Sequence, residues 1–445
     1  MTEHVTAVPV EETAVIDAPG PTVLGAHFSH GYRTYVLVVM ALVYVVNYLD
    51  RQIMGILAHP IKLEFHLSDF QVGILGGPAF AVVYAVLGIP IAIFADRLNR
   101  RNVIAASLAV FSVMTAVCGL AAQYWQLVLA RFGTGVGEAG TSPSINSVLA
   151  DLYPPEQRAS ALAFYSAGLN VGLLVAFFGG GWVAQHYGWR QAFLTAGVPG
   201  LLLGILILAT VQEPKRGQVE NLADTEKAPS LWAVIRALWS QRSFRWIALG
   251  TGMSSLGGYA GIIFIPSFLG ISHHMTLSEI GAALSLLTGV GGAIGTYMAG
   301  VFADRFARRD IRWNMYVMIV ATFLAVPFAP VFYLAPGTAI ALLAAIVPAM
   351  MGAAYIGPAY SMTQSLVPLR MRARAIAILL FILNMIGLGL GPPLVGEISD
   401  LLKPALGADS LRWALLSTVI TGLTGAFCYW RASRTLKADL AKYAA

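Results

Sequence analysis

Charged residues and cysteines are scarce in this sequence. Asp, Glu, Lys and Arg make up only 11% of the 445 residues, against about 25% in soluble domains, and 57% are hydrophobic. This composition argues against a soluble globular protein. The two cysteines, Cys118 and Cys428, lie far apart within apolar runs, so the sequence offers no disulfide framework, zinc site or redox centre.

Signals for secretion, nucleotide binding and metal binding are also missing. Residues 1–30 contain four carboxylates and scattered prolines but no apolar core, which predicts a disordered tail and not a cleavable signal peptide. The glycine-rich runs 133–137 and 387–391 follow no strand pattern, so we expect closely packed helix faces there. We therefore expect no cofactor and no metal, and we do not expect an enzyme.

Long apolar runs are the main feature that the sequence does have. A membrane-spanning helix needs about 20 apolar residues, and the hydrophobic content is enough for twelve such helices. The runs cover residues 32–58, 69–95, 103–121, 126–150, 160–184, 191–210, 246–269, 279–302, 313–334, 338–363, 375–398 and 411–430. They predict an all-α polytopic membrane protein with twelve transmembrane helices.

The basic residues fit the topology of such a protein. The formal net charge is +6, and 22 of the 28 Lys and Arg fall in tails and loops on one side of the predicted spans. The outer loops hold four, and Arg51 and Arg131 lie within spans. The positive-inside rule then places both termini in the cytoplasm, with the chain in the inner or plasma membrane. The charge requires no nucleic-acid partner.

The two halves of the sequence repeat each other. Residues 92–101, AIFADRLNRR, match residues 300–309, GVFADRFARR, at six of ten positions. Both segments follow the second span of a six-span set, which predicts parallel repeats related by an axis along the membrane normal. The expected divisions are a tail (1–30), an N-terminal six-helix bundle (31–210), a cytoplasmic linker (211–245), a C-terminal six-helix bundle (246–430) and a cytoplasmic tail (431–445).

The linker contains a short amphipathic pattern. Ser230 could cap a helix, and tryptophans flank its apolar stripe. The stripe consists of Leu231, Val234, Ile235 and Leu238. We expect this helix to lie on the inner leaflet of the membrane.

The repeated loops and a motif in the fourth span resemble a known family. The loop Asp96-Arg97-x-x-Arg100-Arg101, repeated as Asp304-Arg305-x-x-Arg308-Arg309, resembles the signature loop of the major facilitator superfamily. The pattern Arg131-x-x-Thr134-Gly135-x-Gly137 resembles the second motif of that superfamily. The resemblance covers nearly the whole chain and implies the major facilitator fold, with transport by alternating access.

Shorter stretches are similar to one branch of that superfamily, the spinster subfamily. They are Asn47-Tyr48-Leu49-Asp50-Arg51 in span one, Gly135-Val136-Gly137-Glu138-Ala139-Gly140 in span four and Asp151-Leu152-Tyr153-Pro154 after it. This resemblance implies a lysolipid-like or sphingolipid-like substrate and coupling to protons. The organic-anion symporters share the first two elements, so a small organic anion stays an alternative substrate.

Two carboxylates lie deep within predicted spans, where a charge is costly unless it is paired or hydrated. Helical spacing puts Asp50 on one face of span one with Asn47 and Arg51, and Glu138 on one face of span four with Arg131. We expect these faces to meet in a central cavity that a substrate or a proton reaches. The alternative is that Asp50 with Arg131, and Arg51 with Glu138, are ion pairs that only lock two helices together.

No histidine lies within a predicted span. All eight are in the N-terminal tail or in predicted outer loops, so no imidazole is available to carry a proton through the membrane. If protons drive transport, the carriers are Asp50 and Glu138, whose titration depends on desolvation and on the neighbouring Arg51 and Arg131.

The C-terminal half has no deep charge. Its spans carry a few polar side chains among apolar residues, and a cavity with one charged and one apolar wall suits an amphipathic ligand with an anionic head. Ordinary helix packing would also explain the apolar wall. The expected substrate-binding residues are Asn47, Asp50, Arg51, Arg131, Glu138, Tyr355 and Tyr360, of which Asp50 and Glu138 also couple protons.

The cytoplasmic loops are expected to gate the cavity. Asp96 and Asp304 end spans two and eight, where each carboxylate could face the positive N-terminus of a span in the other half, and Arg97 or Arg101 could meet Asp151. The expected gating residues are Asp96, Arg97, Arg101, Asp151, Arg158, Asp304 and Arg305. The alternative is that these arginines only set the topology.

These patterns predict a monomeric secondary active transporter that works by alternating access in the lipid bilayer. We expect it to be coupled to protons and to move a small amphipathic, lipid-like organic anion. Two alternatives stay open. One is a proton-coupled symporter of a small organic anion, and the other is a membrane receptor of the same fold that transports nothing.

Overall fold

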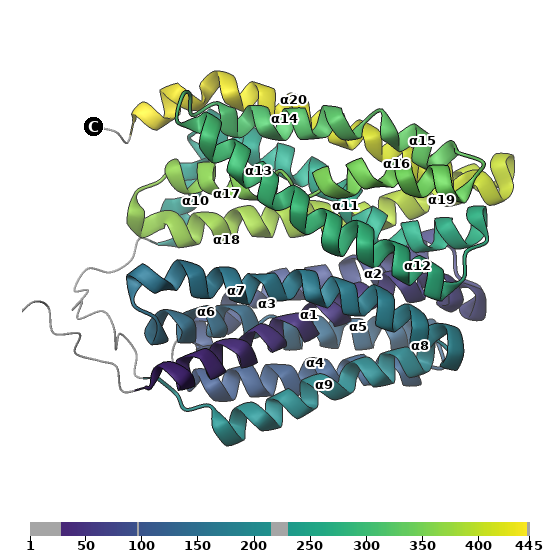
Figure 1. Ribbon diagram of the computed structural model, residues 1–445, viewed down its shortest axis with the longest axis horizontal. Coiled ribbons are helices and arrows are strands. Elements are labelled where there is room, and N and C mark those ends of the chain that lie inside the picture. Colours follow the sequence, from purple (N-terminus) through teal and green to yellow (C-terminus); the bar gives the residue numbers. More distant parts are fainter. Residues whose placement is uncertain (1–27, 96–97, 215–229, 443–445) are drawn as a thin grey trace, which may run out of the picture.

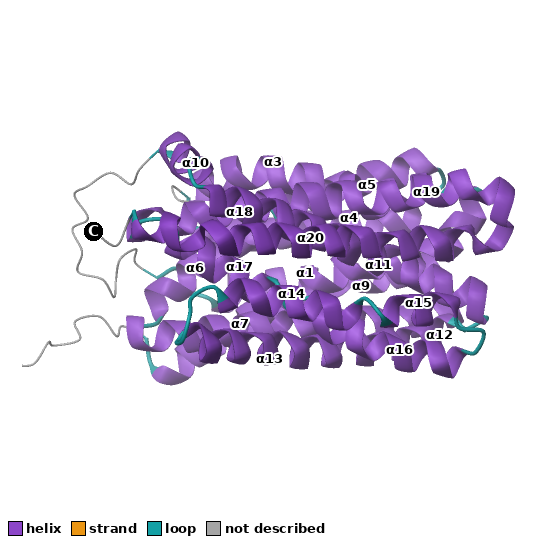
Figure 2. Cartoon of the chain, turned by 90° about the horizontal axis from the view of Figure 1, so that it is seen from above, coloured by secondary structure: helices purple, strands orange, loops and turns teal. Residues whose placement is uncertain are grey.

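Residues 28–95, 98–214 and 230–442 are described by a computed structural model of the chain. Every regular element in those residues is helical, as Figure 2 shows from above. The expected all-α fold is confirmed. The predicted tail up to residue 27 and the predicted gating residues Asp96 and Arg97 lie outside the described residues.

The first half of the chain, here called the N-half, contains the helices up to residue 210. They are α1 (His30–Phe65), α2 (Asp69–Gly76), α3 (Pro78–Ala95), α4 (Arg100–Leu120), α5 (Tyr124–Glu138), α6 (Thr141–Leu152), α7 (Pro155–Leu174), the π-helical turn η1 (Val175–Gly179), α8 (Gly180–Tyr187) and α9 (Trp189–Thr210). The short helix α10 (Leu231–Trp239) follows in the linker.

The second half, here called the C-half, begins at residue 242. Its elements are α11 (Arg242–His273), α12 (Leu277–Leu284), η2 (Ser285–Gly291), α13 (Gly292–Ala307), α14 (Trp313–Ala325), α15 (Phe328–Leu334), α16 (Thr338–Met351), α17 (Ile356–Ser365), η3 (Leu369–Met371), α18 (Arg372–Leu383), η4 (Asn384–Leu390), α19 (Gly391–Leu406), η5 (Gly407–Asp409) and α20 (Ser410–Ala441). The segments η2 and η4 are π-helical, and η3 and η5 are 3₁₀ turns.

Ten helical stretches among the described residues are long and apolar enough to cross a membrane. The longest, Arg372–Ala441, holds two crossings because the chain reverses at η5, so that α19 and α20 lie side by side. Together, α5 and α6 supply one more crossing, which is interrupted at Ala139 and Gly140. The twelve expected crossings are therefore present. The first helix runs to Phe65, beyond the predicted end at residue 58.

The two halves lie side by side with their helices roughly parallel (Figure 1). The start of α1, the end of α20 and the linker helix α10 are all at one end, on the left of Figure 1. We call this the terminal end. The opposite end, where α1 ends and α2 begins, is called the far end. The same arrangement of both halves is the expected fold with two parallel six-helix repeats.

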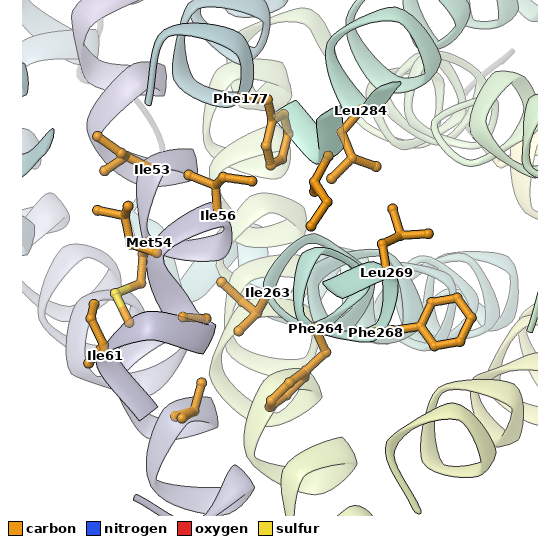
Figure 3. Close-up of a cluster of buried hydrophobic side chains, with 14 of the residues drawn as sticks. Ile53, Met54, Ile56, Ile61, Phe177, Ile263, Phe264, Phe268, Leu269 and Leu284 are labelled. Atoms are coloured by element: carbon orange, nitrogen blue, oxygen red, sulfur yellow. The ribbon is translucent and has the colours of Figure 1, made fainter. Parts of the chain in front are cut away.

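The halves share their largest core only toward the far end. One cluster of buried side chains joins α1 and α8 of the N-half to α11, α12 and α19 of the C-half. Figure 3 shows Ile53 and Ile56 of α1 beside Ile263 and Phe264 of α11. The two other large clusters lie nearer the terminal end, and each belongs to one half. The hydrophobic contact that joins the halves is thus concentrated away from the termini.

A polar junction closes the far end. The carboxylate of Asp400 on α19 accepts hydrogen bonds from the backbone N–H groups of Asp69 and Phe70, at 3.0 and 2.8 Å. These are the first two donors of α2, and Ser68 accepts the next two. A side chain of the C-half therefore completes the N-terminal cap of an N-half helix. Asp69 itself binds Lys62 at 2.5 Å and Ser399 at 3.0 Å.

The linker helix α10 packs against the C-half. Ser230 caps it by accepting the N–H of Ala233 at 3.2 Å. Val234 and Leu238 are fully buried in the core of the C-half, whereas the sequence pattern placed this stripe on the inner leaflet. Trp232 is 77% exposed. Val234 and Leu238 therefore fix α10 to the bundle, and Trp232 and Trp239 stay exposed.

Candidate functional site

The polar faces of α1 and α5 meet inside the N-half. The carboxylate of Asp50 accepts from Nη1 of Arg131 at 3.3 Å and from Oγ1 of Thr115 on α4 at 2.5 Å. Asp50 and Arg131 are each 1% exposed. Asp50 is therefore a fully buried carboxylate with one charged and one neutral partner.

A second ion pair lies beside the first. Arg51 of α1 binds the carboxylate of Glu138, the last residue of α5, and both side chains are nearly buried. The guanidinium carbon of Arg51 also lies 4.8 Å from the ring centre of Tyr84 and 4.9 Å from that of Phe80, both on α3. At these distances a cation is attracted to each ring face by about 0.5–2 kcal/mol. Arg51 is thus held by one carboxylate and several aromatic rings.

Close helix packing brings these groups together. A Cβ atom on Gly135 would lie 2.8 Å from the carbonyl oxygen of Phe80, so only glycine lets α5 approach α3 this closely. Asn47 completes the α1 face, because its Nδ2 donates to Oγ1 of Thr141 at 2.8 Å. The structure therefore joins Asp50 and Arg51 to Arg131 and Glu138 of α5, and Asn47 to the start of α6.

Arg51 and Arg131 each have an N–H donor without a partner among the described residues. The Nε–H groups of Arg51 and Arg131 are buried and have no hydrogen-bond partner among the described residues, and the same holds for the side-chain oxygen of Asn47. A guanidinium has five N–H donors in a planar fork, which suits carboxylate and phosphate groups. These unused donors give an incoming anion a place to bind.

The C-half contributes an apolar and aromatic wall. Phe80 of α3 packs with Leu388 of η4, and Tyr84, Tyr259 and Met385 pack around them. This small cluster joins the two halves next to Arg51. Tyr355 and Tyr360 are half-buried against the core of the C-half.

An apolar cavity of about 260 Å³ lies within the C-half, between α11, η2, α15, α16 and α20. Small residues leave this space open, among them Gly257 and Gly258 next to Tyr259 in the chain. Thr288 and Thr418 are two of its few polar lining residues. A second cavity, of about 280 Å³, lies between Asn170 and Leu174 of α7 and the region around Gly289 in the C-half.

Among the described arginines, Arg100 binds Asp151. Arg100 forms an ion pair with Asp151, donates to Glu213 at 2.7 Å and donates to the carbonyl of Pro214 at 2.7 Å. It is the first residue of α4 and is almost fully buried. Arg101 lies one position farther round the helix, where its guanidinium reaches the carbonyl of Val211 at 3.5 Å. The arginine expected to meet Asp151 was Arg97 or Arg101; Arg101 binds elsewhere, and Arg97 lies outside the described residues.

The other expected gating residues that the structure describes are Arg158, Asp304 and Arg305. Arg158 donates to the carbonyl of Ala150 at 2.8 Å, within the N-half. Asp304 and Arg305 are exposed at the terminal end of α13, without an ion pair to another described residue. Nearby, Arg312 and Lys437 bind Asp310 and hold the pKa of its carboxyl well below the usual range.

Sequence reasoning missed several residues of this site. Phe80 and Tyr84 stand four residues apart on α3, and Thr115 stands in the apolar run of α4. Only the i, i+4 spacing of the two rings signals a shared face. Nothing in the chain around Thr115 distinguishes it from threonines that bind only their own helix.

Comparison with known proteins agrees with this fold. A model of the Major Facilitator Superfamily matches residues 40–392 and 247–443. The chain is 34% identical over 403 residues to an MFS-type efflux pump of Mycolicibacterium smegmatis, which spans 90% of this chain and 93% of the pump. It is 27% identical over 400 residues to the sphingosine-1-phosphate transporter SPNS2 of Mus musculus, which spans 85% of this chain and 72% of that protein.

A solved structure shows the same arrangement. The crystal structure of a bacterial homolog of the human lysosomal transporter spinster, inward-facing and unoccupied, superposes with a TM-score of 0.84. The two sequences are 31% identical, and the match covers 93% of this chain and 99% of that one. This chain therefore belongs to the major facilitator superfamily, as a membrane transporter similar to spinster and not an enzyme.

Proposed function

We propose that this transporter moves an amphipathic, lipid-like organic anion together with protons, by alternating access. The observation that carries the proposal is the pair of buried contacts, Asp50 with Arg131 and Arg51 with Glu138, opposite a wall without charge. Buried ion pairs rarely stabilise a fold more than apolar residues would. Their presence between helices of a transporter is better explained by a ligand that exchanges with one partner.

Charge balance suggests how the exchange works. With both carboxylates ionised, the two arginines are neutralised. An anion that binds Arg51 would leave a buried negative charge unpaired, and losing one partner of a buried pair costs about 3–5 kcal/mol. A proton on Glu138 removes that charge and releases Arg51 for the anion. Binding of one anion and one proton therefore keeps the site neutral, which couples the two.

The remaining parts of the site suit the rest of such a substrate. The head group would bind Arg51 and Arg131 through their unused donors, with Asn47 beside them. Tyr355 and Tyr360 would line its path in the C-half. The apolar tail would enter the 260 Å³ cavity of the C-half. The name of the mouse relative, a sphingosine-1-phosphate transporter, supports a lipid-like substrate.

The arrangement of the cores supports an inward-facing state. The halves join at the far end and have separate cores at the terminal end. We propose that the terminal end is cytoplasmic in the inner or plasma membrane, as the positive-inside rule indicates. One chain supplies both halves of the site, so we propose a monomer. In the opposite state, Asp304, Arg305 and the loop of Asp96 and Arg97 would close the terminal end.

Uptake into proteoliposomes tests the proposal. A pH gradient should drive a fluorescent single-chain phospholipid, and the Glu138→Gln variant should lose this drive. Each buried methylene contributes about 0.8 kcal/mol, so shortening the chain by four methylenes should weaken competition by roughly 100-fold.

The same assay separates the alternatives. Competition by a short dicarboxylate that equals competition by the lipid would favour a symporter of small organic anions. Binding without any flux in wild-type protein would favour a receptor. An uptake rate that is the same with and without a pH gradient would refute proton coupling.

A further inference from the structure

Thr115 and Arg131 bind different oxygens of the buried Asp50 carboxylate, Oδ1 and Oδ2. Oγ1 of Thr115 lies 2.5 Å from Oδ1 of Asp50 and 2.8 Å from the backbone carbonyl oxygen of Phe111. Thr115 is fully buried in α4, so no water competes for its hydroxyl. This hydroxyl therefore has two acceptors, one on each side, and a single proton to give.

The single proton makes the hydroxyl sensitive to the state of Asp50. While Asp50 is ionised, Thr115 donates to the carboxylate. When Asp50 is protonated, its own O–H can donate to Oγ1, and the hydroxyl of Thr115 turns to the carbonyl of Phe111. Both arrangements satisfy every hydrogen bond with no movement of the heavy atoms. A hydroxyl can thus form a hydrogen bond with the carboxyl group of Asp50 both when that group is ionised and when it is protonated.

The other groups around Asp50 cannot replace this contact. Arg131 on α5 is its only ion-pair partner among the described residues, at the long distance of 3.3 Å. Arg51 and Glu138 form the neighbouring pair, and Glu138 interacts electrostatically with Asp50. Cys118, one turn farther along α4, is the other titratable group that interacts with Asp50. The shortest hydrogen bond to Asp50 is the one from Thr115.

We propose that Thr115 is a positioning residue that sets the pH range in which Asp50 takes up and releases its proton. This inference rests on the proposed proton coupling, with Asp50 as the second carboxylate that the sequence analysis expects to carry a proton. Removing the hydroxyl takes a short hydrogen bond from the ionised carboxylate, and hydrogen bonds to charged groups are stronger than neutral ones. Loss of this bond favours the protonated form.

The test compares Thr115→Val, which keeps the shape, with Thr115→Ser, which keeps the hydroxyl. Infrared spectroscopy of purified protein in nanodiscs follows the C=O band of protonated Asp50, identified by its loss in Asp50→Asn. The midpoint of this band should rise by about one pH unit in Thr115→Val, a tenfold change in proton affinity. It should stay within a few tenths of a unit in Thr115→Ser.

Thr134→Val is the matched control, because Thr134 is equally buried in the N-half and its hydroxyl donates to the carbonyl of Arg131 at 2.8 Å. Its midpoint should equal that of the wild type. An unchanged midpoint in Thr115→Val, or an equal shift in Thr115→Ser, overturns the inference. Proton-driven uptake that persists in Asp50→Asn refutes instead the proposed function of Asp50, so the two failures are distinguishable.

Discussion

Asp400 holds the two halves together at the far end, and its removal should favour the state in which that end is open. Its carboxylate caps α2 across the junction, and losing a side-chain cap costs about 0.5–2 kcal/mol. The loss falls on the closed state alone, because water replaces the carboxylate once the end has opened. At about 1.4 kcal/mol per factor of ten, Asp400→Ala should shift the equilibrium roughly 2- to 30-fold.

Distance measurements across the junction test this prediction. Cysteines at Leu63 on α1 and Lys403 on α19 would carry spin labels, since both positions are exposed at the far end. The native cysteines, Cys118 and Cys428, are buried and need not be replaced. In wild-type protein the short distance should dominate. In Asp400→Ala a longer distance should gain population by the factor given above.

Two further variants separate capping from other effects. Asp400→Asn keeps one side-chain oxygen as an acceptor, so its shift should be smaller than that of the alanine variant. Glu397→Ala removes an exposed carboxylate one turn earlier on α19 and should leave the distances unchanged. If Asp400→Ala gives the wild-type distribution, the cap does not hold the far end closed and the reasoning fails.

Other variants test the buried site and the terminal end. Asp50→Asn and Glu138→Gln together should abolish proton-driven uptake in proteoliposomes, because an amide releases no proton; retained drive would refute both carriers. Arg51→Ala should weaken binding of an anionic amphiphile by roughly 10- to 150-fold in calorimetric titrations, because a hydrogen bond to a charged group contributes about 1.5–3 kcal/mol. An equal loss of affinity for a neutral analogue would contradict direct contact between Arg51 and the anionic head. Arg100→Ala should lower the free energy of unfolding by about 3–5 kcal/mol, seen as a lower melting temperature, whereas Arg101→Ala should change it little.

The sequence was sufficient for the twelve crossings, the repeat and the charged faces. Hydrophobic run length and the spacing of Asp50, Arg51, Arg131 and Glu138 are local properties, and helices preserve them. The ion pairs in the structure are those that the sequence analysis weighed as an alternative. The ion pairs serve transport only if a bound anion replaces one partner of a pair. The transport assays test this.

Contacts between distant helices could not be predicted in the same way. Arg100 binds Asp151 because α4 begins at that residue, and a helix start shifted by one position would have presented Arg101 instead. Phe80 and Tyr84 resemble membrane-facing residues until α5 is seen to pack on α3. The sequence also does not show which end is closed, because the same residues are present in both conformational states of a transporter.

The seam between the halves at the far end is built on glycine. A Cβ atom on Gly73 would lie 2.5 Å from the carbonyl oxygen of Pro392, and one on Gly181 would lie 2.5 Å from that of Leu277. At these two positions backbone lies against backbone, next to the apolar side chains of the core that the halves share. The contacts leave no room for a Cβ atom at either glycine while the far end is closed. A bulky side chain at either glycine would force the two backbones apart. We therefore expect such a substitution to keep the far end open.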